Sequence, residues 1–206
     1  MVKKRKGPHG GRRPRNMMIT REGDTINLSL NLAELDPPEL TFEADAMWAT
    51  VRRGAVSFLL DRLSFADESL VEARVEVRLS FEAFGNFWAS TQQQAFVEPF
   101  RKWVERHPGA ERAARGVDTT VPPKLERAVL RANVVRVSYV ETDAELLFYE
   151  YPISTMSLVI NQVASSVSMN GVLRATCTTE TLARFLAACT DVAGQIPSRQ
   201  EKGVST

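Results

Sequence analysis

The chain has 206 residues, 44% of them hydrophobic, which is enough for one large or two small globular domains with a real core. No apolar run reaches the roughly 20 residues of a membrane-spanning helix, and no hydrophobic segment follows the basic N-terminus as in a secretory signal. The two cysteines and two histidines are Cys177, Cys189, His9 and His107, and their spacing predicts neither a disulfide framework nor a structural zinc site. We therefore expect a cytoplasmic protein without a metal or other cofactor.

The net charge of +1 hides a strongly basic N-terminus on a mildly acidic body. Apart from this end, the chain has 19 basic and 25 acidic residues, or −6. Residues 1–16 are rich in Gly and Pro, so we expect a disordered tail. Such a tail binds phosphate backbones through counterion release; acidic protein, anionic lipid or mere solubilisation are the alternatives. The candidate phosphate contacts are Lys3, Lys4, Arg5, Lys6, Arg12, Arg13 and Arg15.

In chain order, alternation of apolar residues predicts four strands in the first half, at 25–32, 39–51, 55–65 and 70–80. A tight turn is expected at 52–54, and a bulge or turn near Ala44 within the second strand. The spacing becomes helical at Phe81, where Ser80 suits the N-cap and Glu82 the first turn. The helical face continues to His107, and we expect Pro99 to break or restart the helix.

The second half predicts the same order of elements after a linker. Residues 108–130 are interpreted as that linker, with a short helix after Pro123. Strands follow at 133–140, 144–151, 156–164 and 171–178, and then a helix capped by Thr178 or Thr179. Residues 194–206 are expected to form a flexible tail.

Local similarities between the halves favour an internal duplication. Residues 57–61 are similar to 157–161, 80–82 to 178–180, and 39–44 to 145–150. Chance similarity of alternating segments is the alternative explanation. The prediction is an α+β fold of two antiparallel four-strand-plus-helix (ββββα) units, residues 17–107 and 131–193, packed as a pseudo-dimer.

The segments FLLDRLSF, VRLSFEAF, VRVS, LVIN and RATCTTETL resemble a family of short bacterial and archaeal proteins of unknown function. The resemblance covers most of residues 25–92 and, more weakly, 131–191. It differs at Phe-Gly-Asn-Phe-Trp in the first helix, where the family has small and basic residues. The family carries no known active site, so the resemblance implies no catalytic residues.

The sequence also lacks a catalytic motif of its own: it has no phosphate-binding glycine loop and no nucleophile elbow. Both cysteines lie on apolar faces, which is typical of buried small side chains. Asp61 shares a strand face with apolar residues, which indicates either a site or a local arrangement: a β-bulge, an edge-strand charge, or a local partner such as Arg53 or Arg78. Asp61 and the aromatics are candidate interface residues, with core packing as the alternative for the aromatics: Trp88, Phe100 and Trp103.

We therefore expect a non-enzymatic protein-interaction or scaffold module, part of a larger bacterial assembly, that binds a protein partner or itself. The alternative is single-stranded DNA or RNA binding, because the order of elements is similar to that of the Whirly and PUR-repeat folds. The basic tail would contribute to that function, with body candidates Arg52, Arg53, Arg78, Arg131 and Arg136. A weaker alternative is a holdase chaperone similar to the SecB family.

Overall fold

The computed structural model describes residues 17–22, 25–30, 35–107, 119–125, 127–152 and 169–196. The chain divides into two compact units, one of Met1–Asp36 with Pro152–Ser168 and one of Pro37–Tyr151 with Met169–Thr206. In the first unit, β1 (Met17–Glu22) and β2 (Thr25–Leu30) form an antiparallel hairpin. The predicted strand at 25–32 is therefore present over its described residues, 25–30, where it pairs with β1.

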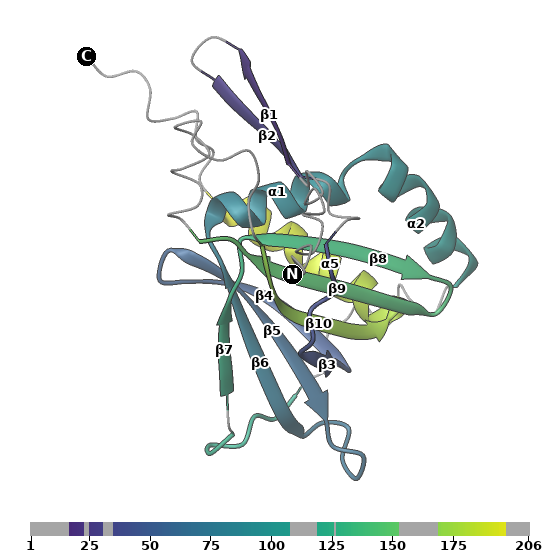
Figure 1. The fold of residues 1–206 in the computed structure, drawn as a ribbon. Coiled ribbons are helices and arrows are strands. Elements are labelled where there is room, and N and C mark those ends of the chain that lie inside the picture. Colours follow the sequence, from purple (N-terminus) through teal and green to yellow (C-terminus); the bar gives the residue numbers. More distant parts are fainter. Residues whose placement is uncertain are drawn as a thin grey trace, which may run out of the picture. The chain divides into compact units, whose positions relative to one another are not determined.

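The second unit has an α+β fold, as predicted, with two four-stranded sheets and three helices among its described residues (Figure 1). The helices are α1 (Phe81–Thr91), α2 (Gln94–Arg106) and α5 (Thr179–Gln195). The first sheet has the order β4 (Ala46–Arg52), β5 (Ala55–Leu63), β6 (Val71–Leu79) and β7 (Arg127–Arg131). The second sheet has the order β3 (Thr41–Glu43), β10 (Asn170–Thr178), β9 (Asp143–Glu150) and β8 (Val134–Val140).

Each sheet takes one strand from the other half of the chain. Strands β4, β5 and β6 are consecutive and antiparallel, and β7 joins them as a parallel neighbour of β6. In the same way, β8, β9 and β10 are antiparallel, and β3 joins them as a parallel neighbour of β10. Reciprocal strands of this kind tie the two sheets into one folded unit.

The prediction of a short helix after Pro123 is wrong, because residues Arg127–Arg131 form strand β7. The segment is only five residues long, and Arg, Ala and Leu all favour helices in isolation. The strand form puts Leu130 against the core and Arg127 and Arg131 on the opposite side. This separation of apolar and charged side chains favours a strand here over a helix. Pairing with β6 therefore overrides the local preference.

The bulge or turn expected near Ala44 is confirmed as a break in the strand expected at 39–51, where the chain leaves the second sheet and enters the first. Another boundary differs from the prediction. Pro99 lies inside α2, and the break between helices comes at Gln92 and Gln93 instead. The predicted strand at 156–164 lies outside the described residues.

The corners between β3 and β4 and between β7 and β8 have the same geometry. Asp45 donates its backbone N–H to the carbonyl of Asp61 at 2.9 Å, and Asn133 donates to the carbonyl of Tyr149 at 3.0 Å. In this geometry Tyr149 has in the second sheet the place that Asp61 has in the first, while the predicted match of 57–61 with 157–161 lies outside the described residues. The proposed match of 39–44 with 145–150 is wrong, because β3 lies at the edge of its sheet and β9 in the middle.

The turns and caps of the two halves also correspond. The β4–β5 and β8–β9 turns each begin with a residue in the left-handed region, Arg53 at φ 49° and Glu141 at φ 52°. Ser80 caps α1 through a hydrogen bond from the backbone N–H three residues later, and Thr178 caps α5 in the same way, as predicted. Helix α1 then packs against β8, and α5 against β4.

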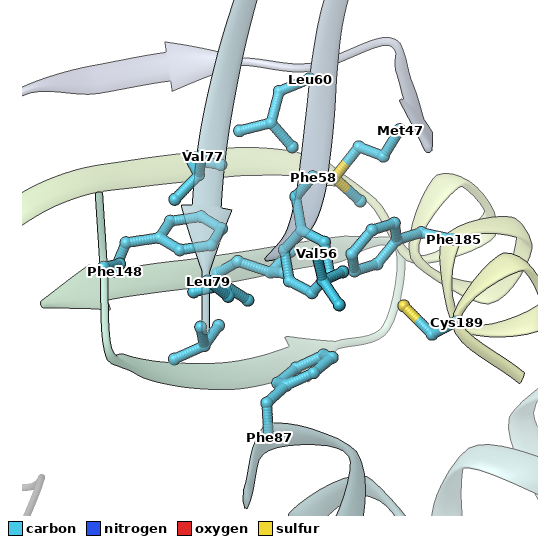
Figure 2. Close-up of a cluster of buried hydrophobic side chains, with 14 of the residues drawn as sticks. Met47, Val56, Phe58, Leu60, Val77, Leu79, Phe87, Phe148, Phe185 and Cys189 are labelled. Atoms are coloured by element: carbon cyan, nitrogen blue, oxygen red, sulfur yellow. The ribbon is translucent and has the colours of Figure 1, made fainter. Parts of the chain in front are cut away.

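One hydrophobic core joins both sheets and two of the helices. Phe58 on β5 is fully buried, and its ring lies 5.5 Å from that of Phe87 on α1, 4.7 Å from Phe185 on α5 and 6.3 Å from Phe148 on β9. Figure 2 shows these rings converging with Cys189 at the side of α5. The side chains on the core face of each sheet pack against this core and are not open to a ligand. A binding surface on either sheet must therefore lie on its opposite face.

Candidate nucleic-acid interface

The face of the first sheet turned away from the core carries a concentration of arginines. Residues with core contacts alternate along each strand, which places the intervening side chains on this other face. Two acidic residues, Asp61 and Glu76, lie among them, so arginines outnumber these acids on this face. We call it the arginine face, and its basic residues are Arg52, Arg74, Arg78, Arg127 and Arg131.

The parallel register of β6 and β7 is what groups these arginines. Arg74 lies beside Arg127, and Arg78 lies beside Arg131, in two rows separated by the pair of Glu76 and Val129. Arg127 and Arg131 are exposed, and Val129 between them is 47% exposed. Neighbouring like charges repel unless counter-charges approach, so this edge of the sheet favours an anionic ligand.

Asp61 is fully buried and binds Arg74 on the next strand. The guanidinium donates to both carboxylate oxygens, Nε to Oδ1 at 2.5 Å and an Nη to Oδ2 at 2.6 Å. These hydrogen bonds raise the pKa of Arg74. The interpretation of a local charge partner is confirmed, although that partner is Arg74 and neither Arg53 nor Arg78. The edge-strand interpretation is wrong, because β5 is a central strand.

Glu76 forms a second polar group on the same face. Its Oε1 accepts hydrogen bonds from Ser57 at 2.9 Å and from Arg78 at 2.7 Å. Burial alone would raise the pKa of Glu76, but these hydrogen bonds, with the charges of Arg78 and Arg52, hold it below its ordinary value. The carboxylate is therefore charged at neutral pH and keeps Arg78 directed along the sheet.

Trp48 is the aromatic residue of this face. Met47 is in the core and Ala49 packs against it, so Trp48 points to the opposite side of β4, next to Leu59 of β5. Its side chain is half-buried. Sequence reasoning missed Trp48, although strand periodicity alone places it with Arg52.

The corresponding face of the second sheet has the opposite charge. Glu43 holds the place in β3 that Arg131 holds in β7, because each precedes an alanine whose backbone N–H bonds to the parallel neighbour. Glu145 there pairs with Arg174 at 3.0 Å. With Arg136 and Asp143, the ionisable residues of this face sum to −1. Arg136, one of the arginines predicted to bind nucleic acid, therefore lies on the second sheet. Arg52, Arg78 and Arg131 lie together on the first.

The other predicted site residues take different places. The basic tail, with all of its candidate phosphate contacts, lies outside the described residues. Trp88 and Phe100 are partly buried against the core, and Trp103 is 7% exposed within an aromatic stack on α2. Together with buried Asp61, they contribute to the packing of this chain, and their role as an interface stays a prediction.

The thiols are expected to be unreactive in the folded protein. Burial raises the pKa of Cys177 to about 12 and that of Cys189 further still. Because the thiolate is the reactive form, we expect native protein at pH 8 to react with a disulfide reagent at least about 100-fold more slowly than urea-unfolded protein. A stopped-flow absorbance measurement checks this. Native reaction at the unfolded rate would contradict the buried placement of Cys189 and the partly buried placement of Cys177.

Other kinds of site receive no support from the described part of the chain. No group of three or more His, Cys, Asp or Glu side chains there is arranged to hold a metal ion. No helix of the described residues has the length and hydropathy needed to cross a membrane. Comparisons with protein-family models, curated proteins and solved structures found no significant match for this chain.

Proposed function

We propose that this protein is a non-enzymatic, cytoplasmic binding module that holds nucleic acid on its arginine face. The observation that carries the proposal is the register of β7 beside β6, which sets exposed Arg127 and Arg131 next to Arg74 and Arg78. Arginines on a sheet bind phosphates through charge and hydrogen bonds. The basic tail, as predicted from the sequence, would add non-specific phosphate contacts.

The acidic residues of the arginine face support this function. Asp61 and Glu76 each accept hydrogen bonds from an arginine beside them, which limits the positions that Arg74 and Arg78 adopt. A preorganised cation loses less conformational entropy on binding than a free one. The buried acids therefore keep the charged groups in place while Arg52, Arg127 and Arg131 supply the excess positive charge.

Replacing Arg127 and Arg131 together by alanine tests the proposal. Each arginine that contacts a phosphate of a single strand contributes about 0.7 to the slope of log K against log salt, so the slope should fall by about 1.4 and affinity at 0.1 M salt by about 25-fold. Fluorescence anisotropy with a labelled oligothymidine measures both quantities. The matched control is Lys102→Ala with Arg106→Ala on α2, which removes the same charge from exposed positions.

Two outcomes would contradict the proposal. The first is an equal loss of affinity in both double variants, which would mean that only the net charge of the protein matters. The second is undetectable binding by the unchanged full chain at low salt. Retained affinity in the α2 control, with loss in the β7 variant, would place the phosphates on the arginine face.

We also propose that the second unit is a tandem pair of ββββα repeats arranged as a pseudo-dimer. In this view the first repeat is β3 to β6 with α1, the second is β7 to β10 with α5, and each gives its first strand to the sheet of the other. The matching corners at Asp45 and Asn133, and the matching turns at Arg53 and Glu141, support it. The opposite charges of the two outer faces then indicate that one of the two sheets, built from strands of both repeats, is specialised for anions.

A protein partner, the first expectation from the sequence, is the second candidate. Phe65 favours it: this side chain is fully exposed in the β5–β6 loop, whose shape is fixed by hydrogen bonds from Ser69 to Asp67. The loop is acidic, which disfavours contact with phosphates. Native mass measurements across protein concentrations test self-association, and a mass of one chain throughout would count against it. The scattered positions of exposed apolar residues give the holdase alternative no support.

A further inference from the structure

We propose that Trp48 is a base-stacking platform, so that the arginine face selects single-stranded over duplex nucleic acid. This inference rests on the function proposed above and adds the residue that would recognise bases. Trp48 would contribute affinity for exposed bases, whereas the arginines would contribute affinity for phosphates. The two contributions are therefore separable by experiment.

The register of the first sheet puts Trp48 in a row that separates the two rows of arginines. Trp48 pairs with Leu59, Leu59 with Glu76, and Glu76 with Val129, so these four residues cross the sheet in one row. The row with Arg74 and Arg127 lies on one side of it, and the row with Arg78 and Arg131 on the other. Adjacent rows of one face are about 7 Å apart along the strands.

The position of Trp48 suits stacking better than core packing. It belongs to β4, at the edge of the sheet, and its ring is half-buried on the face away from the core. The strand beside it carries Leu59, which is 8% exposed, so the floor next to the indole is apolar. The exposed part of the indole is the surface that we propose a flat ligand would cover.

A nucleic acid offers that flat ligand only when its bases are unpaired. In a duplex the faces of the bases are covered by their neighbours, and the protein meets chiefly phosphate and groove edges. In a single strand, bases stack on aromatic side chains while the backbone follows basic residues. Arg78 lies two strands and one row from Trp48, a backbone separation of about 12 Å, so one nucleic-acid strand can meet both.

The experiment compares Trp48→Ala with Trp48→Phe on three probes: an oligothymidine, a duplex of the same length, and inorganic polyphosphate. We expect Trp48→Ala to weaken oligothymidine binding by about 5- to 100-fold, with the salt slope unchanged because no charge is lost. Trp48→Phe should retain most of the affinity. Polyphosphate has no bases, so its affinity should be the same for both variants, which also shows that the arginine face is still folded.

Different results would overturn the role of Trp48 and the proposed nucleic-acid binding. Unchanged oligothymidine binding by Trp48→Ala, or equal affinity of the unchanged protein for duplex and single strand, would overturn the role of Trp48 while the Arg127 and Arg131 result still stands. Equal weakening on oligothymidine and polyphosphate would show that the substitution distorts the face and would also overturn a stacking role. Failure of the unchanged protein to bind any of the three probes would overturn the proposed function itself.

Discussion

Asp61→Ala is expected to destabilise the folded chain by about 3–5 kcal/mol, because it leaves the Arg74 guanidinium without its counter-charge in a buried position. The Arg74 side chain is 9% exposed and that of Asp61 is 0% exposed, so water cannot replace the missing carboxylate. Urea unfolding followed by circular dichroism measures the change. Exposed Asp191 on α5 provides the matched control, and its replacement by alanine should change stability by less than about 0.5 kcal/mol.

A double substitution separates the cost of the orphaned charge from the value of the pair. Asp61→Leu with Arg74→Met removes both charges and fills the space with apolar atoms, and such replacements are often neutral or stabilising. We therefore expect the double variant to be more stable than Asp61→Ala. An Asp61→Ala variant within about 1 kcal/mol of the unchanged protein would contradict the buried pairing. The double variant should keep most of its affinity for nucleic acid, because it removes a buried, mutually neutralised pair and leaves the net charge of the arginine face unchanged.

Elements whose signals are local could be predicted from the sequence. The caps at Ser80 and Thr178 form within three residues of their partners, and the β4–β5 turn at Arg53 needs only a left-handed residue followed by Gly54. Helices α1 and α5 and strands β5 and β6 were predicted for the same reason, since their periodicity is read along the chain. A short segment such as β7 has no comparable local signal, so its outcome depended on pairing.

The grouping of charges depended on that same non-local pairing. Arg52, Arg78 and Arg131 were candidates from the sequence, but Arg127 was interpreted as part of a linker helix, and Arg74 was not considered. Their shared face follows from the parallel register of β6 with a strand almost 50 residues away along the chain. The pairing of Asp61 with Arg74 depends equally on the register after the β5–β6 loop, where the ladder shifts by one residue between Arg62 and Leu63. Periodicity gives the face of each side chain, whereas register gives its neighbour.

The second large effect is expected from Phe58→Ala, which should destabilise the fold by about 3–5 kcal/mol. Phe58 is fully buried and contacts Phe87, Phe148 and Phe185, so truncation leaves a cavity where both sheets and two helices meet. Phe65→Ala is the matched control: it removes the same atoms from a fully exposed side chain, and its effect should be within about 0.5 kcal/mol. Urea unfolding measures both.

The form of the Phe58→Ala transition also tests the exchanged strands. Because β3 and β7 each pair with the opposite half, neither sheet can lose its packing while the other keeps all of its strands. The variant should therefore unfold in one transition at a lower urea concentration, with tryptophan fluorescence and circular dichroism changing together. Two separate transitions would contradict a single shared core, since they would mean that each sheet holds its structure alone. Equal loss in Phe58→Ala and Phe65→Ala would contradict the burial on which this core depends.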